Sequence, residues 1–322
     1  MSHIQRQEVV PMSMADKRLD QIATFLFPEY SRNRLQNWIK SGHLLVDEKP
    51  YRASVRLHGG ERLVLDVEVE DLKAQPEPID LDIVYEDEDL LVINKRADLV
   101  VHPGAGNFSG TILNGLLYHE NSLSTVPGGG LVHRLDKGTT GLMVVAKTLE
   151  SQSNLVGQLQ ARTVKREYEA IVYGKPRTPG KVDAPIGRHR TQRTKMAVRN
   201  GGRPAMTHYR ITRLFVAHSH LELNLETGRT HQIRVHMQHL GFPLVGDDTY
   251  GGHKRRLLNA EVWEQDGIDN FGRPALHAKK LSLIHPGSNK EIMWEAETPD
   301  DFTTLLRNLY AHQVRTQSMG SP

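Results

Sequence analysis

One ten-residue segment constrains this chain more than any other part of its sequence. Residues 133–142 read HRLDKGTTGL, and the apolar residues 143–146 follow directly. The glycine and threonine residues predict a tight turn, and the apolar run predicts a strand. Asp136 therefore lies between basic residues, just before a strand, as suits a single catalytic carboxylate that must be held rigidly and kept ionised. A charged turn between two strands would have a similar composition, so other features must decide.

The composition indicates an ordinary globular protein. The chain has 322 residues, of which 38% are hydrophobic and 25% charged, enough for two domains and a large core. It contains no apolar window long enough to span a membrane, and its first residues lack the apolar stretch of a secretory signal. The absence of cysteine excludes disulfides, thiolate metal sites and a cysteine nucleophile. We expect a soluble cytoplasmic protein.

Charge is distributed unevenly along the chain. Residues 162–213 hold 14 Lys or Arg and 3 Asp or Glu, a local net charge of +11, whereas residues 66–91 hold 11 acidic residues and 1 Lys, a local net charge of −10. A focused positive surface of this kind suits a polyanion such as nucleic acid. A solvated charged face is the alternative for the basic block, and solvated linker and loop residues are the interpretation of the acidic one.

The N-terminal part is predicted to form a small module of helices and strands. We expect a disordered tail over residues 1–13, a domain over residues 14–70 and a Pro-containing linker over residues 71–80. Within the domain, apolar residues recur at helical spacing from Leu19 to Phe27, and a second helix is expected after Ser31 as its N-cap. Short strands are predicted at residues 44–46 and 63–65.

The second part, residues 81–302, is predicted to be a catalytic domain rich in strands. Strands are expected at residues 81–85, 90–93, 99–101, 168–173, 207–212, 221–225 and 233–235. Helices are expected at residues 111–118 and 152–162, and from Pro299 to about Leu309. Since most strands are joined by turns, the pattern favours an α+β fold with a mainly antiparallel mixed sheet. Residues 303–322 are expected to hold the end of the last helix and a tail.

The N-terminal module resembles the S4 RNA-binding domain. The resemblance rests on Arg18-Leu19-Asp20, Ser31-Arg32, the spacing of Ile39 and Gly42, and the short strands. It implies RNA contacts from the first and second helices. The matching residues are Arg18, Arg32, Arg34 and Lys40. Asp47-Glu48 stands where that family often has Asn-Gly. From the residues alone, an accessory domain that does not bind RNA remains the alternative.

The central segment resembles the HRLDxxTSG motif of ribosomal large-subunit pseudouridine synthases that carry an N-terminal S4 domain. Only the Ser of that motif differs, and Thr140 replaces it here. The resemblance implies isomerisation of uridine, in which the N1–C1′ bond breaks and a C5–C1′ bond forms. Because nothing is oxidised or lost, the reaction needs no cofactor and no metal. Asp136 can attack C1′, attack C6 or abstract the 2′ proton, and the sequence does not choose among these routes.

Further site residues are implied by the same resemblance. Arg229, in the segment 226–234, is the expected ion-pair partner of Asp136. Tyr168 matches the active-site tyrosine, whose ring can stack on a flipped base. Arg134 is expected to enter the space that the flipped uridine leaves, and His133 to line the pocket. Taken alone, each of these residues would also suit a structural or solvated position.

A basic stretch and a group of histidines complete the candidates. Arg188, Arg190, Arg193 and Lys195 are expected on a loop that follows RNA phosphates, the alternative being a solvated loop. His231, His236 and His239 lack the spacing of a helical zinc motif and lie in an expected strand, so we predict no metal site.

Together these features imply a monomeric enzyme whose partner is 23S rRNA, in the large ribosomal subunit or its precursor. The S4 module, the linker, residues 100–107 and residues 243–247 resemble the members of the family that modify the helix 69 stem-loop. Three alternatives remain. They are a related synthase for other 23S positions, a non-catalytic RNA-binding assembly factor, and a nucleoside hydrolase or base glycosylase that also places a carboxylate near C1′.

Overall fold

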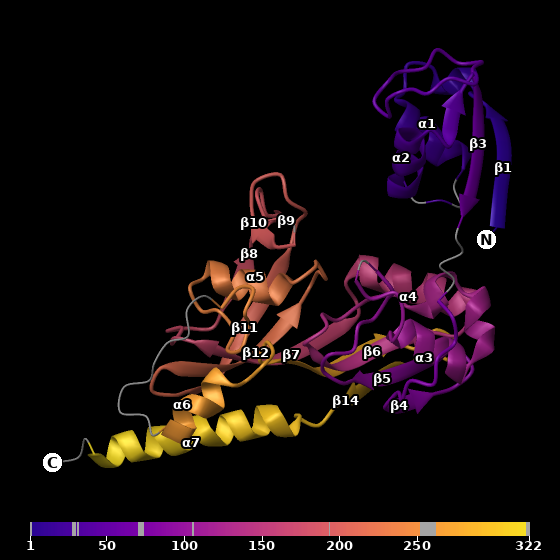
Figure 1. Ribbon diagram of the computed structural model, residues 1–322. Coiled ribbons are helices and arrows are strands. Elements are labelled where there is room, and N and C mark those ends of the chain that lie inside the picture. The colour runs from indigo at the N-terminus through magenta and orange to yellow at the C-terminus, as the bar shows by residue number, and fades with distance from the viewer. Residues whose placement is uncertain are drawn as a thin grey trace. The chain divides into compact units, whose positions relative to one another are not determined.

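The chain forms two compact units, residues 1–73 and residues 74–322, in a computed structural model (Figure 1). The structure describes residues 2–27, 30, 32–69, 74–104, 106–192, 194–251 and 262–319. Among these residues, no helix is both long and apolar enough to cross a membrane. The boundary between the units falls inside the expected linker.

The N-terminal unit combines a small sheet with two helices. Its strands β1 (Ser2–Val9), β2 (Leu44–Val46) and β3 (Arg62–Val69) pair antiparallel in the order β1-β3-β2. The other elements are the 3-10 turn η1 (Met12–Met14) and the helices α1 (Leu19–Leu26) and α2 (Arg32–Ser41). Leu19 and Ile22 of α1, Leu35 of α2, and Leu63 and Leu65 of β3 are fully buried in one core. The predicted helical spacing is therefore the spacing of the core residues.

The first residues differ from the prediction. Residues 2–9 were expected to belong to a disordered tail, but they form β1, which pairs with β3 from Ser2 opposite Val69 to Val9 opposite Arg62. The segment has no apolar alternation, so its order comes mainly from backbone hydrogen bonds to β3. Because this partner lies about sixty residues away in the sequence, a local pattern cannot reveal the strand.

Asp20 is the polar centre of the N-terminal unit. Its side chain is fully buried and accepts hydrogen bonds from Arg18, Arg32 and Gln36, with Arg32 Nη2 at 2.7 Å from Oδ2. Burial alone would raise the pKa of Asp20, but the hydrogen bonds from Arg32, Gln36 and Arg18 outweigh burial and lower it. Of the predicted RNA-contacting arginines, Arg32 therefore joins α2 to α1, whereas Arg18 pairs with Asp20 from the start of α1 itself.

We predict that Asp20→Asn destabilises this unit by about 2–3 kcal/mol, because it removes the charge that two arginines share. In wild type, the contribution of Asp20 is fully present above the ordinary pKa of an aspartate and is lost as the pH falls through its lower folded pKa. Hydrogen exchange of α1 and α2 in the full chain, followed as the pH falls from about 5 to 2, would measure both effects. Asp16→Asn is the control, since the Asp16 side chain is 79% exposed. Equal exchange in the two variants would contradict the prediction.

The C-terminal unit is built on a nine-stranded sheet within the described residues. The strands of the unit are β4 (Ile83–Glu86), β5 (Leu90–Lys95), β6 (Thr140–Ala146), β7 (Lys165–Tyr173), β8 (Gly180–Asp183), β9 (Ile186–Arg188), β10 (Met196–Val198), β11 (Met206–Leu214), β12 (His218–Leu225), β13 (Leu276–Ile284) and β14 (Glu291–Glu295). Its helices are α3 (Ile112–His119), α4 (Leu149–Ala161), α5 (Gln232–His239), α6 (Val262–Asp269) and α7 (Asp300–Met319), with the 3-10 turns η2 (Asn121–Thr125) and η3 (Pro127–Gly130).

The sheet is mainly antiparallel. Its strand order is β4-β5-β6-β13-β7-β12-β11-β8, and β14 pairs with β13 off this path. Among the described strands, only β6 and β13 run parallel, through the residue pairs His277–Thr140 and Ala278–Gly141. Strands β9 and β10 form a separate hairpin. The α+β class and the mixed, mainly antiparallel sheet are confirmed.

Helices cover both faces of this sheet (Figure 1). Along β7, Tyr168, Ala170 and Val172 belong to one core cluster, and Ile171 and Tyr173 belong to another, as alternation in a strand requires. The first cluster includes residues of α3 and α5, and the second includes residues of α6 and α7. A third cluster places α4 against β5, β6, β13 and β14.

Three predicted elements differ in this unit. Residues 99–101 form no strand, and Val100 makes only an isolated bridge with Thr111. Residues 233–235 were expected to be a strand but lie in helix α5, which begins at Gln232. The side chain of Gln232 accepts a hydrogen bond from the backbone amide of Arg229. The last helix continues to Met319, well past Leu309.

Candidate active site

Asp136 lies on a loop that is fixed by buried cations. The loop leads into β6, and the Thr139 amide closes a turn on the Asp136 carbonyl at 3.0 Å. Lys95 Nζ donates to the carbonyl of Lys137 at 2.8 Å, and Arg273 Nη1 donates to the carbonyl of Gly138 at 3.3 Å. Burial lowers the pKa of Lys95 to about 7, the nearby Asp136 charge opposing this shift. Side chains of β5 and of the segment before β13 therefore fix the loop backbone by hydrogen bonds to its carbonyls.

Thr140 and Gly141 join this loop to β13. Gly141 has a φ of +110°, and an added Cβ would lie 2.2 Å from the carbonyl oxygen of Ala278. Glycine is required here because the two backbones approach too closely for any side chain. Thr140, the one departure from the family motif, keeps a hydroxyl that hydrogen bonds His277 Nδ1 at 2.9 Å. The segment that follows Asp136 is thus anchored to β5, to Arg273 and to β13.

The partner of Asp136 is Arg234, not Arg229. Arg234 Nη1 donates to Asp136 Oδ2 at 3.0 Å, whereas Arg229 directs its Nε to the carbonyl of Pro204. The prediction of an Asp136–Arg229 ion pair was therefore wrong. The error follows from the misassigned strand, because helix α5 turns Arg234 toward the loop and leaves Arg229 before the helix. Arg229 nevertheless lines the same pocket as Asp136.

A second carboxylate holds Arg234 in place. Asp247, fully buried, accepts from Arg234 Nε at 2.7 Å and from Nη2 at 2.9 Å, and its Oδ1 also accepts the amides of Thr249 and Tyr250. Burial alone would lower the pKa of Arg234, but the hydrogen bonds and charge of Asp247, together with Asp136, raise it. The guanidinium thus stays charged and presents one free edge to Asp136.

A cavity of about 100 Å³ opens beside Asp136. Tyr168 lines it from β7 with only 5% of its surface exposed, and burial raises the pKa of its phenol. His133 also lines it, and its Nε2 accepts the Val144 amide at 3.0 Å. Burial and then the charge of Arg166 lower the pKa of His133 to about 3, so this imidazole is neutral near pH 7. The cavity therefore presents an aromatic ring, a neutral imidazole and the paired carboxylate.

His231 is a cavity residue that was weighed from the sequence only as a metal ligand. It has a φ of +57° at the start of α5, and its Nε2 lies 3.8 Å from Asp136 Oδ1. Its Nδ1 lies 2.7 Å from the hydroxyl of Tyr250, which also accepts the Met196 amide. Burial lowers the pKa of His231. Both oxygens of Asp136 therefore face a nitrogen-bearing side chain.

The predicted RNA contacts have varied surroundings. Arg134 is exposed and lines the cavity, while Arg188 and Arg190 are exposed at the β9–β10 hairpin and Lys195 is half-buried there. Lys40 is exposed at the end of α2. Arg193 and Ser31 lie outside the described residues, as does the side chain of Arg34.

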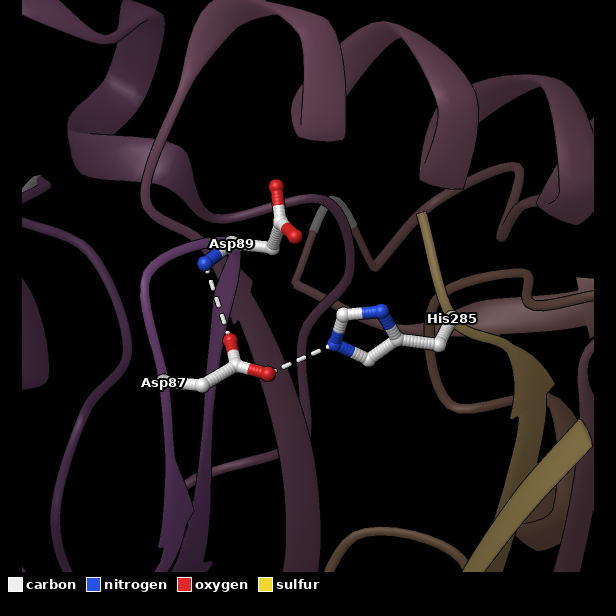
Figure 2. A group of neighbouring side chains, drawn as sticks. All are labelled: Asp87, Asp89 and His285. Carbon is white, nitrogen blue, oxygen red and sulfur yellow. Dashed lines mark hydrogen bonds and ion pairs between the residues drawn. The ribbon is translucent and has the colours of Figure 1, made fainter. Parts of the chain in front are cut away.

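In the described part of the chain, His231, His236 and His239 do not gather as metal ligands. His236 is buried away from His231, between the Thr207 hydroxyl and the Ala184 carbonyl. Among the described residues, only Asp87, Asp89 and His285 gather as ligand types (Figure 2). Asp87 accepts from His285 Nε2 at 2.7 Å and from the amides of Asp89 and Leu90, and Ser151 donates to Asp89. These groups already join the β4–β5 turn to the end of β13.

Comparisons with known proteins identify the family. Residues 89–239 match the model described as RNA pseudouridylate synthase, and residues 17–63 match that of the S4 domain. A Pseudomonas aeruginosa protein named ribosomal large subunit pseudouridine synthase D is 54% identical over 307 residues, covering 94% of this chain and 95% of the relative. The chain belongs to the RNA pseudouridine synthase family. It is an isomerase with an N-terminal S4 domain, as the resemblance predicted.

Further relatives agree with this assignment of the synthase. Proteins of the same name from Haemophilus influenzae and Escherichia coli K12 are 51% and 48% identical, each comparison covering 95% or more of both chains. The solved structure of human RNA pseudouridylate synthase domain containing 4 has a TM-score of 0.56 and 27% identity, covering 71% of this chain and 92% of that one. Human RNA pseudouridylate synthase domain containing 1 has a TM-score of 0.53 and 26% identity, covering 80% and 99%.

We predict that Asp247→Asn lowers kcat of the synthase by about 10- to 100-fold with little change in KM, because Arg234 loses the charge that aims it at Asp136. Steady-state kinetics on RNA would measure both constants. Asp248→Asn makes the same chemical change at an exposed neighbour and should retain wild-type activity. If Asp247→Asn also kept wild-type kcat, the orientation of Arg234 would not depend on Asp247.

Proposed function

We propose that the synthase isomerises uridines of 23S rRNA in the helix 69 stem-loop, acting on the large subunit or its precursor. Two observations support this proposal. The relatives are named ribosomal large subunit pseudouridine synthases, and the chain carries an S4 domain in addition to the catalytic unit. The choice of helix 69 rests on the resemblance of residues 100–107 and 243–247. A related 23S target is the alternative for that choice.

Asp136 is the proposed catalytic carboxylate. The observation that carries this proposal is its position at a cavity wall, 3.0 Å from a guanidinium that Asp247 fixes from behind. A paired carboxylate keeps its charge and its direction while the uracil detaches from C1′. Attack at C1′, attack at C6 and removal of the 2′ proton each require this ionised, oriented group.

Tyr168 and Arg134 are proposed to stabilise the flipped uracil and the RNA that it leaves. The Tyr168 ring lines the cavity beside Asp136 and offers a stacking face to a uracil that has left the RNA helix. Arg134 lies at the exposed rim of the same cavity, two residues before Asp136, where it can fill the space left in the RNA. His133 and Arg229 also line this cavity.

The proposed reaction requires neither a cofactor nor a metal, because it changes neither the composition nor the oxidation state of the nucleotide. The C5 proton is lost to solvent, and N1 gains a proton in its place. We also propose a monomer, in which the S4 unit and the β9–β10 hairpin, which carries Arg188 and Arg190, add affinity for RNA.

The decisive experiment measures tritium release from 23S rRNA labelled at uracil C5, because forming the new C5–C1′ bond expels that hydrogen. We expect release by wild type and a loss of about 1,000-fold or more in Asp136→Asn, with unchanged RNA affinity. Mapping pseudouridine along the product then tests the helix 69 assignment.

Other outcomes would favour the alternatives. Tritium release by Asp136→Asn at the wild-type level would show that Asp136 is not the catalytic carboxylate. Free uracil in the product would indicate a glycosylase or hydrolase. Absence of release from both naked RNA and ribosomal particles, with tight binding retained, would favour an assembly factor. Pseudouridine at other 23S positions would support the synthase activity but contradict the helix 69 assignment.

A separate prediction concerns the β9–β10 hairpin, where Arg188 and Arg190 are exposed. Replacing Arg188 and Arg190 together with Gln should weaken RNA binding and make the slope of log Kd against log salt shallower by about 0.7 for each lost phosphate contact. Filter binding over a range of salt concentrations would measure the slope. A slope equal to that of wild type would mean that the hairpin does not contact RNA phosphates.

A further inference from the structure

Arg166 is a buried arginine whose charge has no evident partner. It lies near the start of β7, two residues before Tyr168 and therefore on the same side of the strand. Its surface is 7% exposed, and its buried Nε makes no hydrogen bond within the described part of the chain. Its charge nevertheless affects the cavity. Burial is the main cause of the lowered pKa of His133, and the charge of Arg166 lowers this pKa further.

The other buried cations of the synthase are satisfied. Within the residues that the structure describes, four lysine or arginine side chains are buried. Arg234 pairs with Asp247 and Asp136, Arg273 pairs with Asp301 at 2.7 Å, and Lys95 donates to two carbonyls. Removing a guanidinium from water without such partners is costly. The position of Arg166 is therefore suited to binding an anionic group of a ligand.

Arg166 stands where two cavities meet. It lines the cavity of Asp136 and also a groove of about 420 Å³ between α4 and residues 226–229. Gly228 makes room for it, because a Cβ at this position would lie 2.8 Å from Arg166 Nη1. Arg162 and Arg229 line the same groove, and Arg162 is already paired with Glu226 at 3.0 Å. The groove thus leads away from Asp136 past a guanidinium that keeps its hydrogen-bonding capacity.

We propose that Arg166 binds a phosphodiester group of the RNA strand next to the uridine that enters the cavity. This inference rests on the proposed function, since it requires an RNA substrate. A guanidinium can donate two parallel hydrogen bonds to one phosphate, which matches its planar fork. The phosphate is favoured over a uracil oxygen because Arg166 faces the groove as well as the cavity, and the strand on either side of a flipped nucleotide must leave the cavity.

The first test compares stability with affinity. Arg166→Met should raise Tm by about 2–4 °C, since a costly buried charge becomes an apolar chain, and should raise Kd for the 23S stem-loop RNA by about 10- to 100-fold. Lys165→Met is the matched control, because Lys165 is the neighbouring cation, 72% exposed and paired with Glu291 on the other side of the strand. A lower Tm with unchanged Kd in Arg166→Met would show a structural role and overturn the proposal.

The second test identifies the ligand group. Stem-loops carrying a single uncharged methylphosphonate at each position near the target uridine should bind wild type about 10- to 100-fold more weakly at one position. Arg166→Met should lose nothing further there, and its salt slope should be shallower by about 0.7. Weaker binding with an unchanged slope, or equal losses in wild type and variant at every position, would rule out the phosphate.

A third variant keeps the charge but moves it. Gly228→Ala should displace the guanidinium through the added Cβ and raise Kd, with a smaller effect on the salt slope than Arg166→Met. Because binding is measured without turnover, these results stand apart from the tritium assay. Absence of tritium release with Arg166-dependent binding would defeat the proposed function alone, whereas release with Arg166-independent binding would defeat this inference alone.

Discussion

The ion pair between Asp136 and Arg234 is the interaction on which the site depends. A single guanidinium joins the loop before β6 to helix α5 and to Asp247, which in turn caps the turn that holds Tyr250. Two carboxylates share one cation, but their surroundings differ. Asp247 is fully buried and structural, whereas Asp136 faces a cavity. Within the described structure, Asp136 is therefore the carboxylate of this network that substrate can approach, since 17% of its side chain is exposed and that of Asp247 is fully buried.

The sheet explains why that ion pair is rigid. The loop of Asp136 rests on Lys95 and Arg273 through backbone carbonyls, so its geometry does not depend on the side chains that face the cavity. Gly141 lets β13 approach β6 closely enough to pair in parallel, and this seam lies five residues from Asp136. A comparable arrangement occurs in the N-terminal unit, where the buried Asp20 of α1 pairs with Arg32 of α2 and with Arg18 at the start of α1. In both units, buried carboxylates orient cations.

The sequence predicted what local patterns encode. The apolar spacing of α1, the turn and strand around Asp136, and the mainly antiparallel sheet all follow from short segments. Contacts between residues far apart in the sequence could not be predicted from such segments. Arg229 and Arg234 lie in one basic segment, and only the helix that begins at Gln232 determines which of them faces Asp136. Strand β1 depends on a distant partner, and Asp247 and Arg166 gain their significance from neighbours that no local pattern names.

The parallel seam also sets when the site can exist during synthesis of the chain. Asp136 emerges early, but Arg234 follows it by 98 residues and the Arg273 that supports its loop follows Gly138 by 135. Strand β13 must then insert between β6 and β7, two strands that were made long before it. Contacts of such large sequence separation slow folding. Because β13 begins only at Leu276, the site cannot be complete until most of the chain has been synthesised.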